Sequence, residues 1–509
     1  MESTSSIAPA GRISTAARCP SLPAEVWGMI FSVGHDDEDG GFWSCFRFPH
    51  LASICRSCTL FRDLVRPRLY YRFHSHLLTQ IYSFNDKEYE RFSVAKFART
   101  ISTNPHLASM VRRVDIQGVC DKWDVVPEAP VPLGYYPDDP MASVLTRKAV
   151  ELGMVLRYYD VYTNVHSPQN VGFDLVALIL VQLPMLDTLD LKWSGTPPMT
   201  RIPQPRSFWP WKKSIRNMTL TYSSIADPTK DDIIRDQRLI PGDCLKPVRS
   251  LISTGTSLTR LTLMDCAGPN LVLPLENLRE AFIIDCQFRP GQFLNLLKPC
   301  KALVKFVTRG TVLSHGPEII EALEPASSGL EVLGLDFVGR NSPRILSFTH
   351  FTALKTLYLD MRCVWNRQVL KNSPPNPDML LTTLLPESIE EVAIFNEGVD
   401  EQFGFEFEAH AKRLALERNV NGRFQHLRWL HGVSFSAIDE NMESDMEQAM
   451  EDGDPDEARE ILTHVSRRLA TLAQAKKLMG DGGVEFSLDL IGVEDSYFSI
   501  DYLIWGLNI

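Results

Sequence analysis

The sharpest chemical pattern in the sequence is Cys55-x-x-Cys58, which follows Cys45 and His50. Thiolates and imidazoles are the ligands that Zn²⁺ prefers, and zinc-site sequences usually show two such pairs at regular spacing. The second pair is missing here, and both Cys55 and Cys58 fall on the apolar stripe of a predicted helix. The pattern therefore favours two cysteines on the apolar face of a helix, and we predict no metal.

The sequence motifs of several large enzyme classes are absent. The chain contains no GxxxxGK[ST] phosphate loop, no GxGxxG after a strand, no HExxH pair and no GxSxG nucleophile elbow. We therefore predict a protein that is not an enzyme, with no catalytic residues and no cofactor. An enzyme with an unrecognised site stays open as an alternative, and its sign would be a cleft with clustered, perturbed acids and bases.

Composition limits the class of protein. Hydrophobic residues make up 44% and charged residues 23% of the 509, as in an ordinary globular chain, and the net charge of -11 argues against a general nucleic-acid binder. Ten cysteines in a chain of this length do not form the dense framework of a small secreted domain. Residues 1–20 lack a signal-like apolar core, and the longest apolar run, 175–181, is too short for a bilayer. We predict a flexible tail at 1–20, a cytoplasmic or nuclear location, and no membrane partner.

Residues 21–75 predict a helical module. Ser21 can cap a helix, Pro23 suits its first turn and Glu25 complements the helix dipole. A second helical pattern runs from Leu51 to Val65, after an acidic, glycine-containing insertion at 34–49. An ordinary helical hairpin packed on the protein's own core is the simpler interpretation of this periodicity.

The Leu22-Pro23 opening and the Leu64-Val65-x-Pro67-x-Leu69-Tyr70 ending resemble the F-box. That module docks substrate receptors onto the Skp adaptor of cullin-RING ubiquitin ligases. The resemblance implies a set of apolar adaptor contacts: Leu22, Pro23, Val26, Ile30, Leu51, Ile54, Cys55, Phe61, Leu64 and Val65. Residues 97–116, with their Asn104-Pro105 turn, resemble the passage from F-box to repeat domain in many fungal F-box proteins.

A six-residue motif, with apolar residues at its first, fourth and sixth positions, then recurs. Its copies begin at Leu186, Ile215, Leu258, Leu278, Leu303, Leu330, Leu354 and Ile389, the Leu303 copy being degenerate. The pattern resembles leucine-rich repeats, and Cys266 and Cys286 take the inward position that small residues favour there. We predict an α/β fold: an irregular leucine-rich-repeat solenoid over 171–435, with parallel strands on its concave face and helices outside. Scattered leucines in an unrelated α/β domain are the alternative.

The flanking segments complete the predicted domain order. Residues 76–170 are a helical linker with the first repeat, in which Met141–Tyr159 is one helix. Residues 436–509 are an acidic segment, a helix starting at Asp454-Pro455 and a capping region.

Side chains between the buried positions of each strand would point to the concave face. We predict that a protein substrate binds there through Asp190, Lys192, Arg260, Thr262, Phe282, Lys305, Arg309, Tyr358 and Asp360. By resemblance, the chain is the substrate-recognition subunit of an SCF-type ubiquitin ligase, with a Skp-family adaptor and, through it, cullin as partners. The alternative is a non-catalytic leucine-rich-repeat scaffold unrelated to ubiquitin.

Overall fold

The computed structural model of the chain divides it into two compact units, Met1–Tyr71 and Arg72–Ile509. The structure describes residues 56–57, 59–75, 84–120, 140–154, 173–194, 210–223, 244–245, 248–267, 275–288, 290–309, 316–336, 347–360, 380–395, 407–435, 448 and 455–491. In the first unit the described element is helix α3 (Thr59–Leu69), which contains Pro67. It covers the end of the second helical pattern predicted from the sequence.

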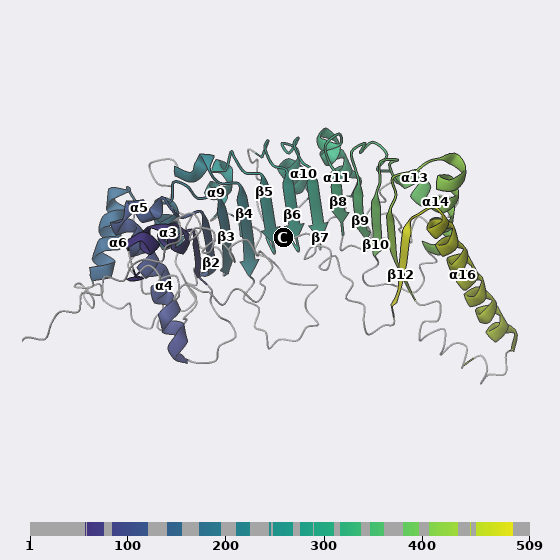
Figure 1. Cartoon of the computed structure of the whole chain (residues 1–509), viewed down its shortest axis with the longest axis horizontal. Helices are drawn as coiled ribbons and strands as arrows, with labels where there is room; N and C mark the ends of the chain where they lie inside the picture. The colour runs from purple at the N-terminus through teal and green to yellow at the C-terminus, as the bar shows by residue number, and fades with distance from the viewer. Residues whose placement is uncertain are drawn as a thin grey trace, which may run out of the picture. The chain divides into compact units, whose positions relative to one another are not determined.

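The second unit contains a twelve-stranded parallel sheet in which the strands follow one another in chain order (Figure 1). This arrangement makes the fold class α/β. The strands are β1 (Arg72–Ser75), β2 (Arg113–Cys120), β3 (Thr188–Ser194), β4 (Asn217–Ser223), β5 (Arg260–Met264), β6 (Glu280–Ile284), β7 (Lys305–Arg309), β8 (Val332–Leu335), β9 (Thr356–Asp360), β10 (Glu391–Phe395), β11 (Trp429–Phe435) and β12 (Glu485–Ile491).

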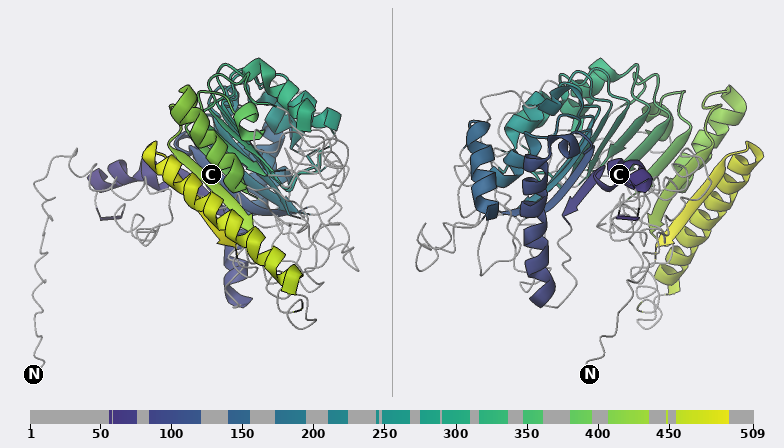
Figure 2. Two further views of the ribbon diagram at one scale, coloured as in Figure 1. Left: turned by 90° about the vertical axis from the view of Figure 1, so that its right-hand side faces the viewer. Right: turned by 60° about the vertical axis from the view of Figure 1, so that its left-hand side comes forward.

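Helices lie between many of the successive strands, and their apolar side chains join those of the strands in the main hydrophobic core. They are α4 (Phe84–Thr103), α5 (Pro105–Ala108), α6 (Pro140–Glu151), α8 (Phe173–Leu180), α9 (Arg249–Thr254), α10 (Pro290–Leu297), α11 (Gly316–Leu323), α13 (Leu380–Leu384), α14 (Phe407–Asn421) and α16 (Pro455–Asp481), with short 3₁₀ helices η2 (Pro210–Lys213) and η4 (Glu324–Ala326). Figure 2 shows α14 and α16 beside the last strands, where they pack on each other and on β11 and β12.

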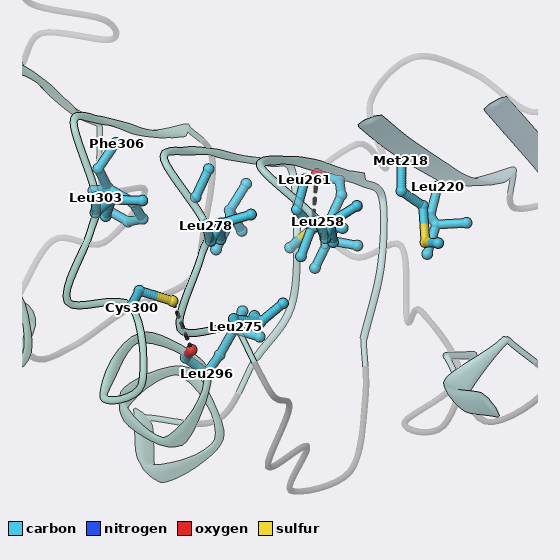
Figure 3. Packing of buried hydrophobic residues seen from close by; sticks show 14 of the residues in the cluster. Met218, Leu220, Leu258, Leu261, Leu275, Leu278, Leu296, Cys300, Leu303 and Phe306 are labelled. Atoms are coloured by element: carbon cyan, nitrogen blue, oxygen red, sulfur yellow. Dashed lines mark hydrogen bonds between the residues drawn. The ribbon is translucent and has the colours of Figure 1, made fainter. Parts of the chain in front are cut away.

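The repeated motif accounts for the main hydrophobic core. Leu258, Leu261 and Leu263 of one copy are 0–2% exposed, and the equivalent positions of the next copies are also buried. Figure 3 shows Leu258, Leu278 and Leu303, each the first residue of its copy, on successive turns of the chain. Burying such a side chain contributes about 1.5–3 kcal/mol, and all the predicted copies form strands of one sheet. The prediction that each copy forms a strand with its apolar positions in a shared core is therefore confirmed.

Backbone hydrogen bonds join each strand to its predecessor at the edge where the strands begin, called here the amino edge. The N–H groups of Thr259 and Arg260 both donate to the carbonyl of Arg216, at 2.8 and 2.9 Å. Those of Arg279 and Glu280 donate in the same way to the carbonyl of Thr259. This paired donation recurs from β3 to β11, so the register of each strand is set by the strand before it.

Cys266 and Cys286 occupy equivalent inward positions just after β5 and β6. The Cys266 thiol donates to the carbonyls of Met264, at 3.1 Å, and Leu220, at 3.6 Å. Asp265 and Asp285 precede the two cysteines with φ of 53° and 51°, in the left-handed region that Asp tolerates better than most residues. Both cysteines are fully buried. The prediction that a small residue lies inside at this position is confirmed, and the structure adds that each thiol bonds backbone carbonyls.

Three segments differ from the prediction. Strand β1 falls within residues 21–75, which the sequence predicts to be helical, and pairs with β2. The helix predicted at Met141–Tyr159 ends at Glu151, where a turn through Gly153 at φ 69° stops it. Strand β11 was not predicted from the motif, because Gly432 stands where the third apolar side chain would be.

Candidate interaction surface

The strand face away from the core, called here the second face, carries parallel rows of side chains. The register pairs the first residues of successive strands, and these are partly or fully exposed: Thr188, Asn217, Arg260, Glu280, Lys305, Val332, Thr356, Glu391 and Trp429. The next row lies two residues further along each strand. It is buried from β5 to β11: Thr262, Phe282, Val307, Gly334, Tyr358, Ala393 and His431. Accessible surface therefore follows the amino edge.

The buried row forms a small hydrophobic cluster of its own. Phe282, Val307, Tyr358 and Ala393 pack together, and Val307 fills the space over Gly334, where an added Cβ would lie 3.0 Å from the valine Cγ1. Burial, with a smaller effect of a nearby glutamate, raises the pKa of Tyr358 to about 12. Neighbouring strands lie only about 4.8 Å apart, so bulky side chains in one row cover each other.

This packing corrects the predicted substrate-binding set. Thr262, Phe282, Tyr358 and Asp360 are at most 6% exposed, so in this structure they do not form an open surface. The other members of the set keep accessible side chains: Asp190, Arg260, Lys305 and Arg309 are half-buried, and Lys192 is exposed. Alternation along a strand predicts which face a side chain takes but not whether its neighbours cover it.

Phe282 lies between two cations. The Arg260 guanidinium is 5.0 Å and the Lys305 ammonium 5.6 Å from the centre of its ring, the range of a cation–π contact. Glu280, on the strand between them, pairs with Arg260 at 3.5 Å. Burial lowers the pKa of Lys305, and the charge of Arg260 acts in the same direction against that of Glu280. The arrangement holds two like charges close together with one carboxylate between them.

A further row lies at the residue immediately before each strand. It contains ion pairs between adjacent strands: Arg216–Asp187 at 3.5 Å, Lys355–Glu331 at 3.1 Å and Arg428–Glu390 at 3.7 Å. Arg279 occupies the same position before β6 and is exposed. The sequence analysis missed this row. Its signal is the residue that follows the first apolar residue of each motif copy.

Strands β1 to β3 bring together a separate charged cluster. The Asp115 carboxylate is hydrogen-bonded to the Nδ1 atom of His74 and lies 3.5 Å from the Arg72 guanidinium. Asp190 is the register partner of Asp115 on β3. Burial, then the charge of Asp115, raises the pKa of Asp190 to about 6, against the opposite effects of Arg113, His74 and Arg72. Basic side chains of β1 and β2 thus partly offset the negative charges of Asp115 and Asp190 at the β1 end of the sheet.

Only part of the predicted adaptor-binding set falls within the described residues. On α3, Phe61 and Leu64 are half-buried and Val65 is buried. The remaining members lie outside the described residues: Leu22, Pro23, Val26, Ile30, Leu51, Ile54 and Cys55. So do the other residues of the zinc pattern, Cys45, His50 and Cys58, and the insertion at 34–49.

Within the described parts of the chain, no group of three or more His, Cys, Asp or Glu side chains is placed to hold a metal ion. Likewise, none of the helices described has the length and apolar character needed to cross a membrane. The sequence matches no model of a known protein family and none of the curated proteins.

Proposed function

We propose that this chain is the substrate-recognition subunit of an SCF-type ubiquitin ligase. Its N-terminal unit would bind a Skp-family adaptor through an F-box, and its second unit would hold a protein substrate. The second unit would be a leucine-rich-repeat solenoid. Catalysis belongs to other subunits in this proposal, and this chain contributes recruitment.

The observation that carries the proposal is the order of the sheet. Twelve parallel strands follow one another in chain order, and the motif copies coincide with strands, each registered by its predecessor. Sheets of this kind are typical of solenoids, which offer long surfaces for protein partners. The amino edge is lined by charged and polar side chains from many strands, which suits a protein surface better than a small-molecule pocket.

The division of the chain supports the two-part character of a receptor. The boundary between Tyr71 and Arg72 separates the segment with F-box resemblance from the sheet. A receptor needs two independent surfaces, one for the adaptor and one for the substrate. Holding both partners on one chain raises the effective concentration of substrate near the ubiquitin-charged enzyme, so a rare encounter becomes an intramolecular one.

Co-purification with a Skp-family adaptor tests the proposal. We expect the wild-type chain to form a stoichiometric complex and the Leu22→Ala/Pro23→Ala variant to lose it while melting at the wild-type temperature. A matched control is Val420→Ala/Leu462→Ala, which truncates exposed apolar side chains of the second unit, 75% and 48% exposed. This control should bind as the wild type does.

Two outcomes would count against the adaptor role. A folded wild type that ignores the adaptor would leave a repeat scaffold unrelated to ubiquitin as the better description of the chain. A large fall in melting temperature for the Leu22/Pro23 variant would place these residues in the protein's own core.

A further inference from the structure

Charge is unevenly distributed along the amino edge. In the middle of the sheet, at the starts of β4 to β7, lie four cations that we call the basic segment: Arg216, Arg260, Arg279 and Lys305. The described carboxylates among them are Asp187 and Glu280, each already paired with one arginine. The turns that lead into these strands add Lys213 and Lys301 against Glu276.

Further along the same edge the balance is reversed. The starts of β8 to β12 and their turns carry Glu331, Glu387, Glu390, Glu391 and Glu485 against Lys355, Arg423 and Arg428. Each of these cations pairs with a glutamate, at 3.1 to 3.7 Å. The edge therefore changes from basic to acidic between β7 and β8.

The basic segment is accessible and partly fixed in place. The side chain of Arg216 is 71% exposed, and Arg279 is exposed and forms no ion pair with a described residue. Arg260 and Lys305 are oriented by the ring of Phe282, which cannot move aside because it is fully buried. Cations that are already oriented lose less side-chain entropy when they bind an anion.

We propose that the basic segment binds an acidic, carboxylate-rich stretch of a partner protein. If the chain is a substrate receptor as proposed above, this partner is its substrate, and in that identification the inference rests on the proposed function. Strands β4 to β7 span roughly 14 Å, which about four to five extended residues can cross. The whole chain carries a net charge of -11, which disfavours acidic partners in general, so the basic segment stands out as the place where one can bind.

The electrostatics of Lys305 agree with this occupant. A carboxylate placed near Arg260 and Lys305 would offset the repulsion between them. The interleaved Asp187 and Glu280 also make the segment a poor track for a continuous phosphate backbone, which needs an uninterrupted run of cations. These features favour a peptide over a nucleic acid.

The test uses the full chain without adaptor and a fluorescein-labelled peptide of Asp, Glu and Gly, with an Asn, Gln and Gly peptide as the neutral probe. Binding is followed by fluorescence anisotropy at low and high salt. The test variant is Arg216→Glu/Arg279→Glu. The control, Lys355→Glu/Arg428→Glu, makes the same change in net charge on the same edge and also breaks interstrand ion pairs.

We expect the wild type to bind the acidic peptide only, with an affinity that falls as salt screens the charges. The test variant should bind about tenfold more weakly or worse, and the control should bind like the wild type. Both variants should melt as cooperatively as the wild type.

Three results would overturn the inference: no binding by the wild type, equal losses in both variants, or tighter binding of a single-stranded RNA of the same charge. Its failure is separable from that of the proposed function. Peptide binding without adaptor binding removes the ubiquitin role alone, whereas adaptor binding without peptide binding removes this inference alone.

Discussion

The ring of Phe407 fills the space beside Gly432 that any larger residue would need. A Cβ built on Gly432 would lie 2.1 Å from the Cε1 atom of Phe407, far inside van der Waals contact. Phe407 begins α14 and is buried, and its ring also stacks on Phe486 of β12. The glycine therefore lets α14 close over β11, where the other copies of the motif, apart from the degenerate one with Thr308, place a leucine or isoleucine.

We expect Gly432→Ala to destabilise the chain by about 1–3 kcal/mol or more, because either the ring or the strand must move. Urea denaturation measures the effect. Gly480→Ala is the matched control, since a Cβ there meets nothing within 4 Å. It should stabilise slightly, as alanine favours a helix over glycine. An unchanged midpoint of urea unfolding for Gly432→Ala would contradict the contact between Gly432 and Phe407. The double variant Gly432→Ala/Phe407→Leu, with a smaller side chain at 407, should recover part of the lost stability.

The pKa of Asp190 predicts a pH dependence of stability. In the folded chain it is raised to about 6 from an ordinary 3.8, so the folded state holds this proton more tightly than the unfolded state. The ionised carboxylate then costs stability. The penalty is absent below about pH 4, grows through about pH 6, and is complete above it.

Asp190→Asn removes that penalty. We expect the variant to be more stable than the wild type at about pH 7, by up to about 3 kcal/mol, and no more stable at about pH 4. Urea unfolding at both pH values gives the comparison. Asn217→Ala, on the neighbouring strand β4, is the control: it changes no titratable group, so its effect on stability should be the same at both pH values. A constant difference between Asp190→Asn and wild type at all pH values would refute the assignment.

The buried cysteines should be inert in the folded chain. Burial raises the pKa of Cys300 to about 12 and that of Cys266 well above its ordinary value, with hydrogen bonds to Cys244 and Cys286 adding to the second shift. The reactive thiolates of Cys266 and Cys300 are therefore scarce at about pH 8. Cys244 and Cys286 are fully buried, so the reagent cannot reach them in the folded chain. We expect Cys244, Cys266, Cys286 and Cys300 to stay unmodified by iodoacetamide in the native state, as measured by mass spectrometry. All four should label in guanidinium, and native labelling at the rate of an exposed thiol would be inconsistent with the structure.

The two units predict independent effects of their mutations. Arg260→Glu breaks an ion pair with Glu280 and places two carboxylates side by side on the second face. Arg260 belongs to the unit Arg72–Ile509, whereas the predicted adaptor contacts belong to Met1–Tyr71. We expect this variant to co-purify with a Skp-family adaptor as the wild type does. Loss of adaptor binding by a folded Arg260→Glu chain would argue against separate adaptor-binding and substrate-binding units.

The sequence predicted the strands well because burial repeats with the motif. Leu258, Leu261 and Leu263 show the reason: each apolar position faces one shared core, so a local pattern carries the global arrangement. Gly432 shows the limit. Its copy of the motif is broken by a contact with Phe407, twenty-five residues earlier in the chain, and no local pattern reveals such a contact.

The candidate surface was predicted only in part, again for physical reasons. Periodicity assigned Arg260 and Phe282 to the same face, as the structure has them. It could not show that Phe282 is closed over while Arg260 stays accessible, because burial depends on side chains from neighbouring strands. The edge row that includes Arg279 was missed, since only the sheet aligns these residues.

The paired backbone hydrogen bonds at the amino edge also affect how the sequence of such a chain can evolve. Each strand takes its register from the carbonyl before the preceding strand, as Thr259 does from Arg216, and the lengths of the connections leaving the opposite edge play no part in it. From the end of β4 to the start of α9 the chain spends far more residues than from β6 to α10. Insertions can thus accumulate in the connections between strands. A whole repeat, meaning one strand with its connection, can also be duplicated or deleted without disturbing the pairing of the remaining strands.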